Sequence, residues 1–167
     1  VLRELGGRIP LILDGGPCRH GLESTIVRVG ETGLEILRPG PITREQLADF
    51  GEILTPTHAD AVPGGMKSHY APRTPLEILV VRDGVCADPA QAIDCSRLGL
   101  LAWTLEGKGF GTVEALSPHQ DLREAAANLF GAMRRLDEAG FERILAEPVP
   151  EVGLGVAIMD RLRKAAA

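Results

Sequence analysis

The stretch SPHQDLREAAANLFGAMRRLDEAGFERILAEPVPEVGLG, residues 117–155, contains the clearest secondary-structure pattern of the chain and decides its fold class. Apolar residues recur at helical spacing from Leu122 to Leu136, and Gly140 ends the pattern. A strand over 144–149 and a second helix over 153–163 are expected to follow. This alternation predicts an α/β fold with a mostly parallel sheet and helices on its faces.

The long helix is preceded by a capping pattern. Ser117 and Gln120 have the spacing of a capping box, in which a hydroxyl and a side-chain amide satisfy the first N–H groups of a helix. The sequence therefore predicts that the helix starts directly after Ser117.

Two segments of the chain show the α/β alternation, and a linker over 55–75 separates them. The C-terminal segment, residues 76–167, has further predicted strands over 76–81, 99–104 and 112–116. The N-terminal segment, residues 1–54, has predicted strands over 9–13, 24–29 and 34–37, and a helix that Thr43 and Gln46 cap and Gly51 ends. Three strands and one helix bury too little apolar surface for an independent core and leave an open sheet edge. We therefore expect the chain to be a fragment that starts inside a domain.

Composition excludes several classes of function. The net charge is −5, so the chain as a whole has no basic surface for nucleic acid. No apolar run approaches the length of a membrane span, and no membrane partner is expected. Three cysteines, an odd number without a CxxC pair, argue against a disulfide framework or a zinc site and favour the reducing cytoplasm; they are Cys18, Cys86 and Cys95.

The linker contains PGGMKSHYAPRTP, residues 63–75, which is richer than a spacer requires. An inert spacer needs only glycine, proline and small polar residues. This one places Lys67, His69 and Tyr70 between stiffening prolines. We predict that it lies over a site as a lid or strap.

Other motifs, taken singly, have two interpretations. The hydroxyls of Ser24 and Thr25 fit a small polar ligand, or only the edge of a strand. Arg38 fits a phosphate, or is only a solvated charge at a strand end. The glycines of 14–21 are typical of a tight turn. Those of 153–155 lack the third glycine of a dinucleotide site, and a turn at a helix start is the better interpretation.

Three of these stretches together resemble a known family in order and spacing: LILDGGPCRHGLESTIVRV (11–29), LEILRPGPIT (34–43) and PGGMKSHYAPRTPL (63–76). They resemble the threonylcarbamoyl-AMP synthase family in its two-domain form. The resemblance implies that residues 1–54 are the C-terminal part of a YrdC-like α/β domain. It implies that 55–75 are a linker with a HYAP-type motif, and that 76–167 are a small Rossmann-like domain.

The resemblance also implies an activity. The family comprises nucleotidyltransferases that make L-threonylcarbamoyl adenylate and pyrophosphate from L-threonine, bicarbonate and ATP, with Mg²⁺ expected on the ATP. The product passes to the machinery that adds threonylcarbamoyl groups to tRNA. By this resemblance Ser24 and Thr25 bind the substrate threonine, Arg38 holds the nucleotide phosphates, and Tyr70 closes over the nucleotide with support from His69.

The sequence departs from the family in two places. The family's Lys-x-Arg and Ser-x-Asn motifs lie upstream of LILDGG and are not in this chain, so the chain alone is expected to be inactive and any contact with tRNA to come from the absent part. Met159 stands where the family usually has asparagine, which is expected to affect local capping. The alternative hypothesis is that residues 76–167 form a stand-alone module for ligand sensing or partner docking.

Overall fold

The structure is a computed structural model that describes residues 1–16, 18–56, 63, 69–82, 85–87 and 94–167. Lys67 of the predicted lid lies outside the described residues. The helices are α1 (Leu2–Leu5), α2 (Arg44–Leu47), α3 (Leu122–Glu138) and α4 (Leu154–Ala165), with 3-10 turns at Ala48–Phe50 and Cys95–Arg97. The strands are β1 (Ile26–Val29), β2 (Leu34–Arg38), β3 (Ile53–Leu54), β4 (Leu76–Ile78), β5 (Val80–Arg82), β6 (Val85–Ala87), β7 (Leu98–Ala102), β8 (Thr112–Ala115) and β9 (Arg143–Ala146).

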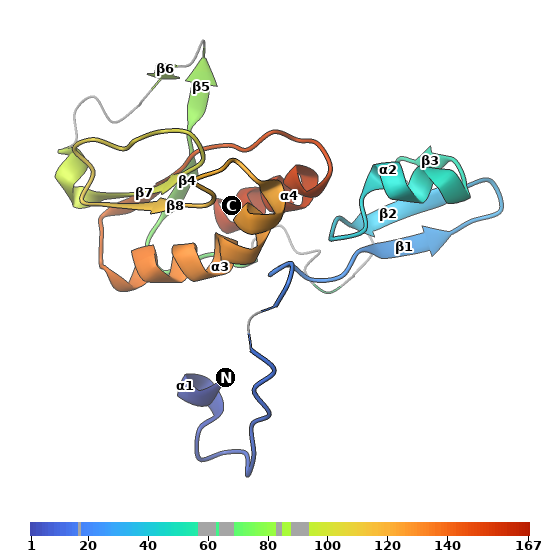
Figure 1. The fold of residues 1–167 in the computed structure, drawn as a ribbon, viewed down its shortest axis with the longest axis horizontal. Helices are drawn as coiled ribbons and strands as arrows, with labels where there is room; N and C mark the ends of the chain where they lie inside the picture. The colour runs from blue at the N-terminus through green and yellow to red at the C-terminus, as the bar shows by residue number, and fades with distance from the viewer. Residues whose placement is uncertain (17, 57–62, 64–68, 83–84, 88–93) are drawn as a thin grey trace.

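The larger sheet contains four strands in the order β4-β9-β7-β8, and every neighbouring pair is parallel (Figure 1). The predicted mostly parallel sheet is confirmed. The single strand predicted over 76–81 is wrong, because the chain leaves this sheet after the N–H of Leu79 donates to the carbonyl of Ala146. Strand β5 then pairs with β6 in a separate antiparallel ribbon.

Both long helices cover one face of the four-stranded sheet. Leu101 of β7 belongs to the same buried cluster as Leu129 of α3 and Ile158 of α4. The neighbouring Leu100 points the other way, because side chains alternate along a strand, and its cluster is covered by Phe110 from a loop. Helices on both faces were expected. In the described part of the chain they occupy one face, and none of them is long and apolar enough to cross a membrane.

The start of α3 differs from the predicted capping box. Gln120 has a left-handed φ of 56°, so the chain turns there and the helix begins only at Leu122. The Asp121 carboxylate is the N-cap and accepts from the N–H groups of Arg123 (2.6 Å) and Glu124 (3.2 Å). The Ser117 hydroxyl instead accepts from the Asp121 N–H at 2.9 Å and closes the preceding turn.

The smaller sheet has the order β1-β2-β3, with β1 and β2 antiparallel and β2 and β3 parallel. The predicted capping box of Thr43 and Gln46 is confirmed at the start of α2. The buried strand predicted over 9–13 is wrong: Leu11 is 71% exposed and Leu13 is 88% exposed. That run extends away from both sheets and finds no strand to pair with among the described residues (Figure 1).

The glycines at the start of α4 form the predicted helix-start turn. Gly153 is the N-cap and has φ of 52°, a conformation that favours glycine. Gly155 is buried, and a Cβ atom added there would lie 1.8 Å from the carbonyl oxygen of Pro150. The backbone can pass so closely only because no side chain is present.

We therefore expect Gly155→Ala to lower the free energy of unfolding by about 1–3 kcal/mol, because the added methyl overlaps backbone that cannot move freely. Gly131→Ala in α3 is the matched control. Its methyl would meet only the flexible end of Arg135 at 3.3 Å, so it should be neutral or stabilising by up to about 1 kcal/mol. Urea unfolding followed by circular dichroism measures both, and equal effects would contradict the close contact at Gly155.

Candidate functional site

The predicted site residues lie where the smaller sheet meets the linker and α4. In the β1–β2 ladder, Ile26 is opposite Arg38. This register places Arg38, at the end of its strand, beside Ser24, just before the start of the other. Sequence spacing alone could not bring the two together, because the register depends on the hairpin between them.

Arg38 is buried, with 8% of its surface exposed, so its interpretation as a solvated strand end is wrong. Its Nε donates to the Ser24 carbonyl at 3.0 Å, and its Nη2 donates to the Ser24 hydroxyl at 3.1 Å. Its Nη1 donates to the Pro63 carbonyl at 2.9 Å. One guanidinium therefore joins the predicted substrate segment to the first residue of the predicted lid.

Gly40 allows these segments to approach closely and was not singled out from the sequence. A Cβ atom there would lie 2.5 Å from the Thr25 nitrogen and 2.6 Å from the Glu23 oxygen. The Thr25 hydroxyl donates to the Ile42 carbonyl at 2.8 Å and accepts from the Ile42 N–H at 3.0 Å. The Thr25 side chain thus stabilises the close approach of these two segments. Its contact with the substrate stays a prediction. The sequence pattern that could have identified Gly40 is the Pro-Gly pair directly after Arg38.

Tyr70 has a left-handed φ of 66°, which is strained for a bulky residue and costs on the order of 1–3 kcal/mol. Such a conformation persists only where neighbours fix it. The His69 ring meets the Tyr70 ring edge-on with centroids 4.0 Å apart, and the Phe130 ring of α3 lies at 5.2 Å. The His69 N–H donates to the Lys164 carbonyl of α4 at 3.1 Å. This end of the linker is therefore held between α3 and α4.

His69 also carries an unusual atom. Its Nδ1 is buried, and nothing in the described structure forms a hydrogen bond with it. Buried polar atoms are nearly always paired, so each exception calls for an explanation.

Glu23, which sequence analysis did not place in the site, connects Tyr70 to the cluster. Burial acts to raise the pKa of the Glu23 carboxyl, but hydrogen bonds from its own backbone N–H, from the Tyr70 hydroxyl and from Arg161 outweigh it and hold that pKa below its usual range. Burial first, and then the hydrogen bond to Glu23, raises the pKa of the Tyr70 hydroxyl. Arg38 is close enough to oppose that rise electrostatically. Glu23, Arg38, Tyr70 and Arg161 thus form one electrostatic cluster.

Arg161 of α4 was also missed. It is 0% exposed, and its Nε donates to Glu23 Oε2 at 3.0 Å and its Nη2 to the Pro39 carbonyl at 3.1 Å. Its guanidinium carbon lies 5.5 Å from the centroid of the Tyr70 ring. The sequence contained a pattern that could have predicted its burial, because Arg161 follows Ile158 by three positions and so lies on the apolar face of α4.

Met159, on the same helix, does not cap it. The residue is buried, and its sulfur accepts from the Val149 N–H at 3.4 Å. The expected effect on local capping is therefore corrected: this side chain satisfies a backbone donor of the loop before the helix.

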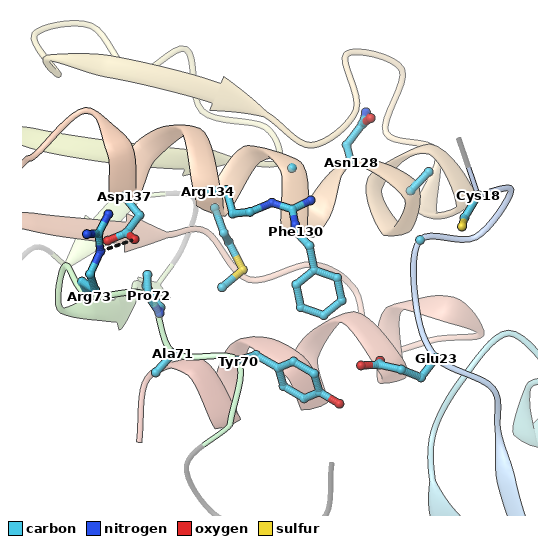
Figure 2. A pocket seen from close by; sticks show the side chains of 14 residues that line it. Cys18, Glu23, Tyr70, Ala71, Pro72, Arg73, Asn128, Phe130, Arg134 and Asp137 are labelled. Carbon is cyan, nitrogen blue, oxygen red and sulfur yellow. Dashed lines mark hydrogen bonds and ion pairs between the residues drawn. The ribbon is translucent and has the colours of Figure 1, made fainter. Parts of the chain in front are cut away.

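A cavity of about 700 Å³ opens beside Tyr70, between α3, residues 18–23 and residues 70–73 (Figure 2). Tyr70 and Phe130 give it aromatic walls, and Arg134 and the ion pair of Arg73 with Asp137 give it charged ones. Its volume suits a small-molecule ligand. Tyr70 and Glu23 line it, whereas Ser24, Arg38 and His69 do not. No group of three side chains suited to holding a metal ion occurs in the part of the chain that the structure describes.

Comparisons with known proteins agree with the resemblance. A family model described as "Threonylcarbamoyl-AMP synthase, C-terminal domain" matches residues 42–167. The threonylcarbamoyl-AMP synthase of Bacillus subtilis is 35% identical to this chain over 188 residues, which cover 99% of this chain and 51% of that protein. The chain thus spans about half the length of the curated relatives it matches.

Two solved structures have a similar fold. One is a crystal structure of P. abyssi Sua5 complexed with L-threonine, with a TM-score of 0.78 and 30% identity, covering 99% of this chain and 52% of that one. The other is a P. abyssi Sua5 variant in which an adjacent histidine and tyrosine are both replaced by alanine. It has a TM-score of 0.76 and 33% identity, and it covers 96% of this chain and 49% of that one.

Titration of Tyr70 tests the cluster directly, because the chain contains one tyrosine. Tyrosinate absorbance should show a pKa above the ordinary value of about 10. The unfolded chain then loses this proton first, so the stability contributed by the neutral side chain is present below about pH 10 and is lost as the pH rises through the raised pKa. Glu23→Gln should lower the Tyr70 pKa, because it removes the hydrogen-bonded carboxylate.

Glu151→Gln is the control, because Glu151 pairs with Arg163 at the surface. It should leave the Tyr70 titration unchanged. Identical titration curves for Glu23→Gln and the unmodified chain would show that the contact between Glu23 and Tyr70 does not form.

Proposed function

Because this chain belongs to the threonylcarbamoyl-AMP synthase C-terminal domain family, we propose that it is the C-terminal part of a synthase. The complete enzyme would make L-threonylcarbamoyl adenylate and pyrophosphate from L-threonine, bicarbonate and ATP. The observation that carries this proposal is the convergence of Ser24, Arg38 and Tyr70, from three segments, around the buried guanidinium of Arg38. The product would serve the threonylcarbamoyl modification of tRNA in the cytoplasm, a compartment that the cysteine usage favours.

Arg38 would bind the phosphates of ATP. The reaction attacks the α-phosphate, so negative charge must be neutralised and the reactants held in line. A guanidinium presents five N–H donors in a rigid fork, and Arg38 uses three hydrogen bonds to hold Ser24 and Pro63. A phosphate would use the remaining donors or take the place of the Pro63 carbonyl. In the second case nucleotide binding would release the start of the lid. Mg²⁺ would arrive with ATP.

Ser24 would bind threonine. Its hydroxyl accepts from Arg38, which leaves the O–H hydrogen to donate to a carboxylate or hydroxyl of the amino acid. The similarity to P. abyssi Sua5, which was crystallised with L-threonine, supports this class of substrate. Thr25 would act mainly through its two hydrogen bonds to Ile42, which keep the Ser24 segment against Gly40.

Tyr70 and His69 would close over the nucleotide. A tyrosine ring can cover a base while its hydroxyl keeps a hydrogen bond. The adjacent histidine and tyrosine replaced in the P. abyssi variant have one counterpart here, since the chain's single tyrosine directly follows His69. The Nδ1 of His69 is buried and has no hydrogen-bond partner among the described residues, which supports a ligand contact at this place. Closure would exclude water from a labile adenylate.

The alternative of a stand-alone module receives less support. The cavity beside Tyr70 is the best candidate for a sensing site, yet Cys18, Gly21 and Glu23 form one of its walls. Residues 76–167 alone would lack that wall and the linker residues 70–73. That segment has parallel strands with helices on one face, which supports a Rossmann-like fold. We infer that it serves as a scaffold beside the site.

In the complete enzyme, Arg38→Ala should weaken the apparent affinity for ATP about 10–150-fold, because a charge-assisted contact contributes roughly 1.5–3 kcal/mol. The effect on threonine should be smaller. Arg38→Lys should restore part of the loss, since a point charge cannot reproduce the fork. Arg44→Ala, at an exposed position of α2, is the control. Steady-state kinetics with each substrate varied provide the measurement, and unchanged ATP affinity in Arg38→Ala would remove Arg38 from the nucleotide site.

The chain by itself should release no threonine-dependent pyrophosphate, because the family's Lys-x-Arg and Ser-x-Asn motifs are outside it. The complete enzyme should release pyrophosphate and form threonylcarbamoyl adenylate, detected by mass spectrometry. Equal rates for the two proteins would show that the reaction does not need the upstream motifs.

A further inference from the structure

Arg161 is the most demanding side chain to bury in this molecule, because a guanidinium removed from water must be paired and hydrogen-bonded. It is 0% exposed and meets that requirement with Glu23, Asp160 and the Pro39 carbonyl. Lys164 also bonds Asp160, at 2.9 Å. Among these contacts of Arg161, two cations thus face two carboxylates.

The partners of Arg161 lie next to the proposed substrate contacts. Glu23 directly precedes Ser24, and Pro39 directly follows Arg38. One side chain from α4 therefore holds both segments that carry those contacts. The same guanidinium lies 5.5 Å from the centre of the Tyr70 ring, a cation–π distance. Glu23, its ion-pair partner, lies close enough to the Tyr70 hydroxyl for each group to shift the pKa of the other.

Helix α4 has two further attachments to these segments. The carbonyl of Lys164 accepts from the N–H of His69, next to Tyr70. At the other end of the helix, Gly153 lies beside Glu45 of the N-terminal segment on the wall of a second cavity. The helix is thus fixed to the N-terminal segment and to the linker at once. Arg161 is the attachment that reaches Ser24, Arg38 and Tyr70 through their immediate neighbours.

We propose that Arg161 is a positioning residue, through which the C-terminal unit holds Glu23 and Tyr70 in place at the proposed adenylate site. This inference rests on the proposed function. Arg161 touches no substrate in this role. It keeps the Tyr70 hydroxyl and the segments of Ser24 and Arg38 in one arrangement, and misplacement of such groups by about 1 Å can reduce a rate by about 100-fold.

The test compares Arg161→Met and Arg161→Lys in the complete enzyme with Arg163→Met. Arg163 lies two positions further along α4, is exposed, and pairs with Glu151 at the surface. The readouts are kcat, the KM for each substrate, and the ratio of threonylcarbamoyl adenylate formed to ATP consumed. All assays are made at a temperature where circular dichroism shows the variants to be folded.

Arg161→Met is expected to lower kcat about 10–100-fold and to lower the yield of adenylate per ATP, because a misplaced Tyr70 leaves the adenylate open to water. Arg161→Lys should give an intermediate loss, since an ammonium keeps the charge but not the fork that reaches Glu23 and Pro39 together. Arg163→Met should remain within about twofold of the unmodified enzyme, as expected for a surface ion pair.

A merely structural role predicts a different result: lower thermal stability, with normal kcat and normal yield in the molecules that remain folded. That outcome would overturn the inference. If Arg161→Met does not fold, Glu23→Gln breaks the same ion pair with almost no change in size, and a normal adenylate yield in this variant would overturn the inference equally. An unmodified enzyme without threonine-dependent pyrophosphate release would instead refute the proposed function itself.

Discussion

A fully buried guanidinium fixes the arrangement of three parts of this chain. Arg161 has no contact with water, so it is stable only where protein acceptors surround it. Those acceptors come from α4 itself and from two points of the smaller sheet segment, at Glu23 and Pro39. The small sheet segment contacts α4 through this polar pairing, and Leu22 of the same segment packs against the core to which α4 belongs. Removing one partner would leave a buried charge unpaired. Because that is costly, the ion pair holds the two segments strongly together.

Residues 69 and 70 of the linker lie beside this contact. The C-terminal end of the linker is attached to α3, where the N–H of Thr74 donates to Asp137 at 2.8 Å, and to α4 through His69. Between these points Tyr70 takes up a strained, left-handed backbone conformation against Phe130. The cost of that conformation is offset by the contacts of the Tyr70 ring with His69, Phe130 and Arg161. A lid anchored in this way would transmit a change at the site directly to the C-terminal unit.

Arg38 would connect the other end of the proposed lid to the site, through its hydrogen bond to the Pro63 carbonyl. Its bond to the Pro63 carbonyl uses the same fork that is proposed to bind phosphate. A ligand anion and the lid would therefore compete for one guanidinium, while Ser24 stays bonded to it on the other side. Such competition gives a physical route from nucleotide binding to movement of the linker. The C-terminal unit, in this view, is the fixed support against which the linker closes.

The sequence by itself determined the α/β class, the parallel sheet, helix α3 and the cap at Thr43. These features follow from local periodicity and from side chains that form hydrogen bonds with nearby backbone groups. The sequence also identified the family through three ordered motifs, which the family model and the relatives confirm. It failed at 9–13, where an apolar run does not become a strand unless another strand pairs with it.

Only the tertiary structure decided which polar residues form the site. Glu23 and Arg161 are 138 positions apart and became partners because folding places α4 against the start of β1. No local pattern contains that information. The amphipathic spacing of α4 marks Arg161 as buried, but the acceptors that allow its burial belong to another segment. A charge removed from water is paired with whatever acceptors the fold brings to it, and for that reason Glu23 and Arg161 could be assigned to the site only in three dimensions.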